Sequence, residues 1–252
     1  AGQPCGGTAG TLKSLQKLIE TYIPSRCFIF WESGGSLRRR EIFKEYKSNR
    51  KPIKLNRFYE DDIPADENNE TQQKINLINI LKHLPVCQVY VDGTESDDQI
   101  AYLCRNTFRF QKKIIASSDK DFYQLLDEHT TIYSPTKKKI YTEQDVLAEF
   151  KIHPRNFALA KAITGDTSDN INGIPSAGFK TIAKRFPELA NSQELDINQF
   201  LELSSRLSDK LSLKQKILEN AELLKRNMKL IDLSINQMLS AHQIQKIDYA
   251  VE

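Results

Sequence analysis

Two stretches decide the predicted fold: VCQVYVDGTESDD over residues 86–98 and KIIASSDKD over residues 113–121. In each, an apolar run of strand length ends in acidic residues that open the next helix. The same alternation extends outward, with strands predicted at 27–31, 86–91, 113–117, 130–134 and 138–141, and helices at 11–22, 74–84, 96–105, 119–126 and 142–150. This order predicts an α/β fold with a largely parallel central sheet flanked by helices.

The second half of the chain changes character. From about residue 146 the strand pattern ends, and helices are predicted at 154–164, 179–186, 197–207 and 210–227. A loop rich in Gly, Asn and Asp spans 165–178. We therefore divide the chain near residue 145, into an α/β core over 1–145 and a helical region over 146–252.

Composition narrows the class of protein. The chain has 252 residues, of which 39% are hydrophobic and 27% charged, and a net charge of +3. These values are ordinary for a soluble globular protein. No apolar run approaches the roughly 18 residues of a membrane span, and no signal-peptide pattern opens the chain. The cysteines are widely spaced, which favours reduced thiols and a cytoplasmic location.

The charge is unevenly distributed between residues 36 and 70. Basic residues dominate 36–57 and acidic residues 60–70, and the segment has no clear apolar stripe, so we expect it to be exposed and partly helical. A charge run is often only a solvated surface. Aromatic residues alternate with the cations here, among them Phe43 and Tyr46, which fits a surface for single-stranded nucleic acid better.

Acidic residues collect where the apolar runs end, so they are expected to meet at one edge of the sheet. They are Glu32, Glu95, Asp97, Asp98, Asp119, Asp121, Asp166 and Asp169. Carboxylates held this close raise one another's pKa unless a cation neutralises them. Because no Cys or His has ligand spacing near them, Mg²⁺ or Mn²⁺ is favoured over Zn²⁺.

A Gly-bounded turn, Gly173-Ile-Pro-Ser-Ala-Gly178, precedes the helix predicted from Phe179. Such a turn leaves backbone N–H groups free for a phosphate, and Lys180 and Lys184 add positive charge at the same end.

These patterns together resemble the 5′-nuclease family, which contains flap endonucleases, the 5′→3′ exonuclease domain of bacterial DNA polymerase I, and free-standing bacteriophage 5′-exonucleases. The resemblance covers roughly residues 6–185 and looks closest to the phage enzymes. It rests on five segments in the family's order: Glu45-Tyr-Lys-Ser-Asn-Arg50, Glu95-Ser-Asp-Asp98, Ser118-Asp-Lys-Asp121, Gly165-Asp-Thr-Ser-Asp-Asn-Ile171 and Gly173-Ile-Pro-Ser-Ala-Gly178.

The resemblance implies a PIN-like nuclease core, a C-terminal helix-hairpin-helix-type DNA-binding region, and two-metal hydrolysis of DNA phosphodiesters. Glu32, Glu95, Asp97 and Asp98 match positions around a first Mg²⁺ or Mn²⁺, and Asp119, Asp121, Asp166 and Asp169 match those around a second. Arg39 and Lys47 would approach the scissile phosphate from a basic arch over 36–70.

For DNA binding, the resemblance implies that Tyr46 stacks on a base near Arg50. Gly173, Ile174, Ser176, Gly178 and Lys180 would hold the duplex backbone, with K⁺ bound at the hairpin. The implied substrate is DNA with a 5′ single-stranded end or flap, together with RNA–DNA hybrid, for a monomer in the cytoplasm, or in the host cytoplasm if phage-encoded.

Three features depart from the family pattern. Residues 1–10 do not resemble the family's first strand, which ends in a metal-binding Asp, so we expect the chain to lack that strand. Glu32 stands where the family usually has Asp, and Ser176 where a hairpin Gly is common. These departures leave open a non-catalytic relative that binds branched DNA. An RNA nuclease is disfavoured by the hairpin, and an aspartyl-phosphate phosphatase by the lack of a DxDxT-like nucleophile.

Overall fold

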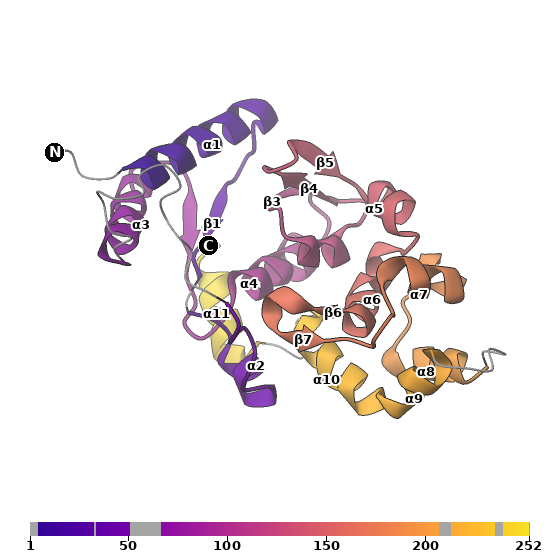
Figure 1. Ribbon diagram of the computed structural model, residues 1–252. Helices are drawn as coiled ribbons and strands as arrows, with labels where there is room; N and C mark the ends of the chain where they lie inside the picture. The colour runs from indigo at the N-terminus through magenta and orange to yellow at the C-terminus, as the bar shows by residue number, and fades with distance from the viewer. Residues whose placement is uncertain (1–4, 33, 51–66, 207–212, 235–238, 252) are drawn as a thin grey trace, which may run out of the picture. The chain divides into compact units, whose positions relative to one another are not determined.

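The computed structural model describes residues 5–32, 34–50, 67–206, 213–234 and 239–251. Figure 1 shows the described residues in colour, and their contacts divide the chain into two compact units. The first unit comprises Ala1–Trp31, Lys51–Tyr90 and Tyr249–Glu252, and the second comprises Glu32–Arg50 and Val91–Asp248. Every residue of the candidate site lies in the second unit. None of the helices described is long and apolar enough to cross a bilayer.

The first unit packs two helices on a two-stranded parallel sheet. α1 (Gly6–Tyr22) and α3 (Glu67–Leu81) meet through Leu15, Leu77 and Leu81, and residues on one face of the sheet pack against the same cluster. The strands are β1 (Phe28–Phe30) and β2 (Cys87–Val89). The predicted elements at 11–22, 27–31, 74–84 and 86–91 are therefore confirmed in type, but α1 begins at Gly6 and α3 at Glu67, well before the predicted starts.

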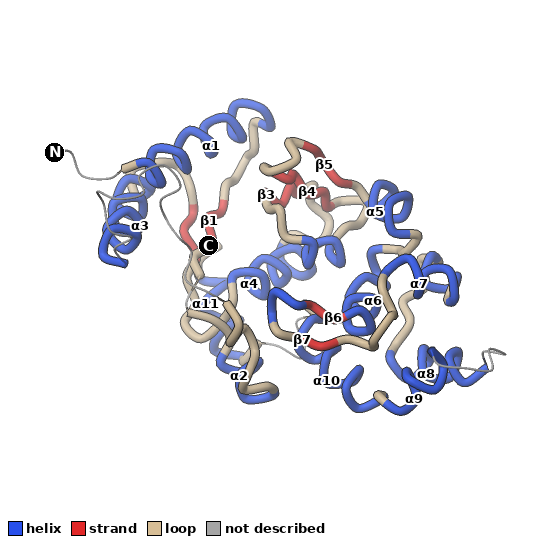
Figure 2. The backbone as a smooth tube through the Cα atoms, viewed as in Figure 1, coloured by secondary structure: helices blue, strands red, loops and turns tan. Residues whose placement is uncertain are grey.

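The second unit contains a three-stranded sheet in the order β3-β4-β5 (Figure 2). β3 (Lys113–Ala116) runs parallel to β4 (Thr130–Ser134), and β5 (Lys139–Tyr141) returns antiparallel to β4. Side chains of β4 alternate between buried and half-buried, which is the two-residue period of a strand with one face on the core. All three strands agree with the sequence prediction.

Most of the other elements of the second unit are helices. The elements before residue 151 are α2 (Leu37–Ile42), α4 (Ser96–Tyr102) with a π-helical turn at Leu103–Thr107, a 3₁₀ helix at Lys120–Leu125, and α5 (Glu143–Phe150). Those after it are α6 (Phe157–Thr164), α7 (Phe179–Arg185), α8 (Ile197–Arg206), α9 (Leu213–Glu219), α10 (Ala221–Ile231) and α11 (Ala241–Tyr249). Short 3₁₀ turns lie at Pro154–Asn156, Thr167–Asp169 and Pro187–Ala190.

The helices α4 and α5 begin in different ways. Thr142 caps α5 in a capping box with Asp145, as its sequence pattern predicts. Neither Ser96 nor Asp97 caps α4, because the cap residue is Glu95 and its side chain makes no capping hydrogen bond. Instead, Glu32 accepts hydrogen bonds from the Ser96 backbone N–H at 3.2 Å and from its hydroxyl at 2.8 Å. Because Glu32 is distant in the chain, no local sequence pattern marks it as the residue that caps this helix.

Two features were not predicted. β6 (Gly165–Asp166) and β7 (Ile171–Asn172) pair antiparallel beyond residue 146, where we expected no strands, and at two residues each they are too short to carry a period. The observed division into units also differs from a boundary near residue 145, because one core cluster contains side chains from both sides of it.

Candidate metal and nucleic-acid site

Three of the predicted acids form a tight cluster. Side-chain oxygens of Asp121, Asp166 and Asp169 lie within 4.8 Å of one another. Asp121 is in the 3₁₀ helix that follows β3, while Asp166 and Asp169 belong to the turn after α6. The Ser168 backbone N–H and hydroxyl donate to Asp166 at 2.9 and 2.6 Å, which fixes the orientation of that carboxylate.

Two glycines allow the chain to bring these acids together. The 165–172 ribbon folds back on the end of α6 (Figure 1), where Gly165 has φ +79°. A Cβ on Gly165 would lie 2.4 Å from the backbone N of Gly173, and a Cβ on Gly173 would lie 2.2 Å from the carbonyl carbon of Thr164. Neither backbone can yield to a side chain, so glycine is required at both positions.

A lysine that the sequence analysis did not select lies inside the cluster. The ammonium of Lys161, on α6, donates to Asp166 at 2.6 Å and also to Asp121. Its side chain is almost fully buried. Burial opposes the charged form of Lys161, but the two carboxylates outweigh it and raise its pKa above the usual value. The available signal was one lysine within the apolar run FALAKAIT, because a buried lysine requires a partner.

A second acidic group comes from the start of α4. Arg39 of α2 forms a two-pronged ion pair with Asp98 at 2.6 and 2.7 Å and contacts Glu95 at 3.1 Å. Its Nε donates to the Leu230 carbonyl at 2.7 Å, and the side chain is only 2% exposed. The expectation that the segment from residue 36 is exposed is therefore wrong for Arg39, which is buried among acids.

The pKa values in this group reflect its crowding. Burial would raise the pKa of Glu95, but Arg39 and Lys47 outweigh it and lower that pKa. Burial raises the pKa of Asp98 in spite of Arg39. Burial and the neighbouring Asp98 hold the pKa of Asp97 well above its usual range. Additional positive charge beside Asp97 and Asp98 would stabilise their ionised forms.

Tyr46, Lys47 and Arg50 join the two acidic groups. The Tyr46 hydroxyl lies 3.0 Å from Glu95 and 3.1 Å from Asp169. The Lys47 ammonium lies 2.7 Å from Glu95, and Arg50 lies 2.6 Å from Asp169. Lys47 also has the left-handed φ of 59°, an uncommon conformation for a lysine and one that concentrates at functional sites.

Tyr46 differs from its expected role. The ring is 5% exposed and packs with buried residues of α6 and α10, so in this structure it has no face available to a base. Burial raises the pKa of its hydroxyl far above the usual value, which leaves Tyr46 neutral, with a single proton to share between Glu95 and Asp169. The rest of the expected arch, residues 51–66, lies outside the described residues.

Glu32 and Asp119 lie at the periphery of this network. Both are exposed. Glu32 is engaged with Ser96, and Asp119 accepts from the Asp121 backbone N–H at 2.9 Å as the cap of its 3₁₀ helix. Asp97 accepts from the Asp98 backbone N–H at 2.9 Å. Metal ligation by these three residues remains a prediction.

The hairpin at 173–178 has a buried and an exposed side. Ile174 and Ala177 are buried in the core, and the Ile174 N–H donates to the Ile163 carbonyl at 2.8 Å. Ser176, Gly178 and Lys180 are exposed. Ser176 has φ +71°, a value that favours glycine, which agrees with its noted departure from a hairpin Gly. The exposed side can meet a nucleic-acid backbone, whereas the Ile174 side chain cannot.

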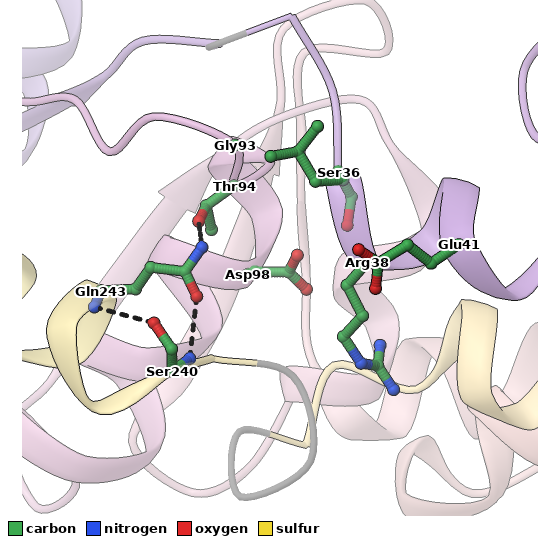
Figure 3. Close-up of a pocket in the computed structure, with 9 residues that line it drawn as sticks. Ser36, Arg38, Glu41, Gly93, Thr94, Asp98, Ser240 and Gln243 are labelled. Atoms are coloured by element: carbon green, nitrogen blue, oxygen red, sulfur yellow. Dashed lines mark hydrogen bonds between the residues drawn. The ribbon is translucent and has the colours of Figure 1, made fainter.

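A pocket of about 300 Å³ opens beside Asp98 (Figure 3). Its lining includes Ser36 and Arg38 from around α2, Thr94, and Gln243 of α11, whose amide donates to the Thr94 hydroxyl at 2.5 Å. Both oxygens of Asp98 already accept from Arg39. The pocket is thus less suited to a metal than the cluster of Asp121, Asp166 and Asp169.

The residues of that cluster fit a divalent cation. Its ligand atoms are carboxylate oxygens, the donors that Mg²⁺ and Mn²⁺ prefer. Burial raises the pKa of Asp121 to about 6, with Asp119 and Asp166 adding repulsion against the attraction of Lys161. The rise reflects mainly the cost of burying a charged carboxylate, while Lys161 and Ser168 lower the pKa of Asp166 in the same cluster in spite of its burial.

Comparison with known proteins places the chain among nucleases by sequence. Residues 1–151 match the family model described as "5'-3' exonuclease, N-terminal resolvase-like domain". A 5'-3' exonuclease of Buchnera aphidicola subsp. Schizaphis graminum is 31% identical over 196 residues, covering 75% of this chain and 63% of the relative. The 5'-3' exonuclease of Bacillus subtilis is 30% identical, with 75% and 60% covered. The chain thus spans less than two thirds of these relatives.

Solved structures agree in fold. The bacteriophage T5 5'-exonuclease with bound zinc ions has a TM-score of 0.78 at 22% identity, covering 99% of this chain and 91% of that one. A T5 flap endonuclease in a pseudo-enzyme–product complex with DNA and metal ions has a TM-score of 0.77 at 22% identity, with the same coverage. This likeness supports the predicted α/β architecture.

Proposed function

From the premise that the chain belongs to the 5'-3' exonuclease family, we propose that it is a metal-dependent 5′-nuclease that hydrolyses DNA phosphodiesters. Its activities would be 5′→3′ exonuclease and 5′-flap endonuclease. The observation that carries the proposal is the cluster of Asp121, Asp166 and Asp169, joined through Asp169 to the basic residues Lys47 and Arg50. Acids that hold metal and cations that attract phosphate are the two requirements of this chemistry.

Asp121, Asp166 and Asp169 would hold one Mg²⁺ or Mn²⁺, and Glu95, Asp97 and Asp98 a second. Glu32 and Asp119 would complete the two sets. When bound, the pair of metals would activate water and stabilise the leaving oxygen of an in-line displacement. Asp121 and Asp166 stay aimed at one point because Lys161 and Ser168 hold their oxygens.

Lys47 and Arg50 are the basic residues that can turn from the acids to a phosphate. Both are less buried than Arg39, and Arg50 is half exposed. Lys47 would stabilise charge at the scissile phosphate, while Arg50 would guide the single-stranded 5′ end. Arg39 is a positioning residue, since its guanidinium is fully engaged by Glu95, Asp98 and the Leu230 carbonyl.

The duplex would lie on the helical region over 146–252, with the helix-hairpin-helix-type turn at 173–178 contacting the backbone and holding K⁺. The residues that would contact backbone phosphates are Gly173, Gly178 and the exposed Ser176 and Lys180. Such contacts do not depend on the base sequence. The same proposal includes action on RNA–DNA hybrid, a monomeric state, a largely parallel sheet in the nuclease core and a cytoplasmic location. Figure 1 shows the hairpin leading into α7 beside α6.

Lys180→Ala tests the duplex contact. Removing one phosphate contact should weaken duplex binding equally across sequences and reduce the slope of log affinity against log salt by about 1. Fluorescence anisotropy at several salt concentrations measures both quantities. Lys17→Ala removes an exposed lysine from α1 and should leave the slope unchanged. A sequence-dependent loss, or an unchanged slope for Lys180→Ala, would contradict the assignment.

Cleavage of a labelled duplex with a 5′ single-stranded flap tests the proposed activity. We expect cleavage near the junction with Mg²⁺ or Mn²⁺, none with a chelator, and little on a 3′-flap duplex. Binding without cleavage under all these conditions would sink the enzyme proposal. It would favour the non-catalytic branched-DNA-binding relative, which one observation supports: Arg39, Lys47, Arg50 and Lys161 already pair with the carboxylates.

A further inference from the structure

Lys161 lies inside the proposed metal-binding cluster. It is 8% exposed, and it contacts two of the three carboxylates that form the metal-binding cluster, Asp121 and Asp166. Burying an isolated ammonium is costly, so the residue is tolerated because the acids neutralise it. In the metal-free protein, these ion pairs therefore link α6 to the 3₁₀ helix that carries Asp121 and to the turn that carries Asp166.

We propose that Lys161 is a built-in counter-ion that occupies the cation position between Asp121 and Asp166 and competes with divalent metal for them. The inference rests on the proposed metal-dependent function and adds a determinant of metal affinity to it. In the metal-free protein, the ammonium holds the two carboxylates together. When metal binds, the ammonium has to leave at least one of the oxygens it contacts.

Electrostatics gives the direction of this effect. A monocation at hydrogen-bond distance from both carboxylates repels a dication seeking the same oxygens, and it does so in a partly desolvated site where screening is weak. One like charge this close shifts cation binding at a carboxylate by about one to three logarithmic units, as it shifts a proton's. A neutral residue in place of Lys161 should thus make metal bind more tightly.

Lys161 differs from Arg50, which also pairs with an acid of the cluster, in being shielded from solvent. Arg50 pairs with Asp169 but is half exposed, so its release costs little. The Lys161 side chain is 10% exposed, and its two acid partners are each 14% exposed. We therefore expect competition between Lys161 and the metal to lower the metal affinity of this cluster more than competition between Arg50 and the metal.

Calorimetric titration of the whole chain with Mn²⁺, without DNA, tests the inference independently of cleavage. Lys161→Met keeps the length of the side chain and removes its charge, and we expect it to bind Mn²⁺ at least about tenfold more tightly than the wild type. Lys161→Arg keeps the charge and should retain an affinity close to that of the wild type. Lys225→Met removes an exposed lysine from α10 and serves as the matched control.

The outcomes separate this inference from the proposed function. Equal or weaker binding by Lys161→Met, with measurable binding by the wild type, overturns the counter-ion role alone. No Mn²⁺ binding by either protein overturns the metal-dependent function as well. A merely structural lysine would not produce a gain in affinity on removal.

If Lys161→Met does not fold, a measurement on the wild-type protein still tests the inference. Reductive methylation followed by mass spectrometry reports the accessibility of each lysine amine. We expect Lys161 to be protected without metal and to become modified when Mn²⁺ is saturating, whereas Lys225 should react equally in both conditions. Unchanged protection of Lys161 overturns the inference.

Discussion

Arg39→Met is expected to lower the free energy of unfolding by about 3–5 kcal/mol, because it leaves buried acids without their partner. The guanidinium makes a two-pronged ion pair with Asp98 and reaches Glu95, and all three side chains are nearly inaccessible to water. Methionine fills a similar volume but offers no positive charge. The Leu230 carbonyl at the end of α10 also loses its donor.

Chemical denaturation followed by circular dichroism measures this loss, with Arg40→Met as the matched control. Arg40 is the next residue of α2, is exposed, and donates to the Gly34 carbonyl. Its replacement should change stability by no more than about 0.5 kcal/mol. A stable Arg39→Met protein with impaired cleavage would show instead that Arg39 acts on the phosphate, as the resemblance to 5′-nucleases implied.

Asp166→Asn is expected to slow cleavage of the 5′-flap substrate by roughly 100- to 1,000-fold, the cost of removing one electrostatic element from a reaction centre. Asparagine keeps an oxygen that can accept from the Ser168 N–H and hydroxyl, so the turn after α6 should remain folded. What it loses is the negative charge that, with Asp121 and Asp169, would hold the metal.

Single-turnover kinetics at saturating enzyme separate this chemical defect from weakened binding. Flap binding measured with Ca²⁺ or without metal should stay within a few-fold of the wild type. Glu149→Gln, which neutralises an exposed acid on α5, should cleave normally. Cleavage by Asp166→Asn at the wild-type rate would remove the cluster from the proposed mechanism.

The strands and helices that lead to Asp121 followed from local patterns, whereas β6 and β7, beside Asp166, did not. Each of β3 and β4 is an apolar or alternating run bounded by polar residues, and Thr142 marks the start of α5. The placement of Asp121 followed from the same reasoning, since it comes directly after β3. These features depend on neighbours within a few residues, which a sequence displays directly.

The pairing of charges did not follow from local patterns. The basic segment was expected to face solvent and phosphate, yet Arg39 and Tyr46 are buried against acids far away in the chain. Lys161 was not selected although Asp166 is only five residues away, and its second partner, Asp121, is forty residues distant. Glu32 was grouped with the first metal ligands, and no local pattern predicted its hydrogen bond with Ser96.

The sequence by itself determined which residues could bind metal and phosphate, and the order of elements that presents them. Only the tertiary structure decided which cation neutralises which acid, because that choice depends on distance and burial after the chain has closed. Glu95 and Asp169 share Tyr46 and Lys47, while Asp121 and Asp166 share Lys161. Electrostatic energy rises as water is excluded, so these long-range pairs, rather than the local acidic patterns, set the properties of the site.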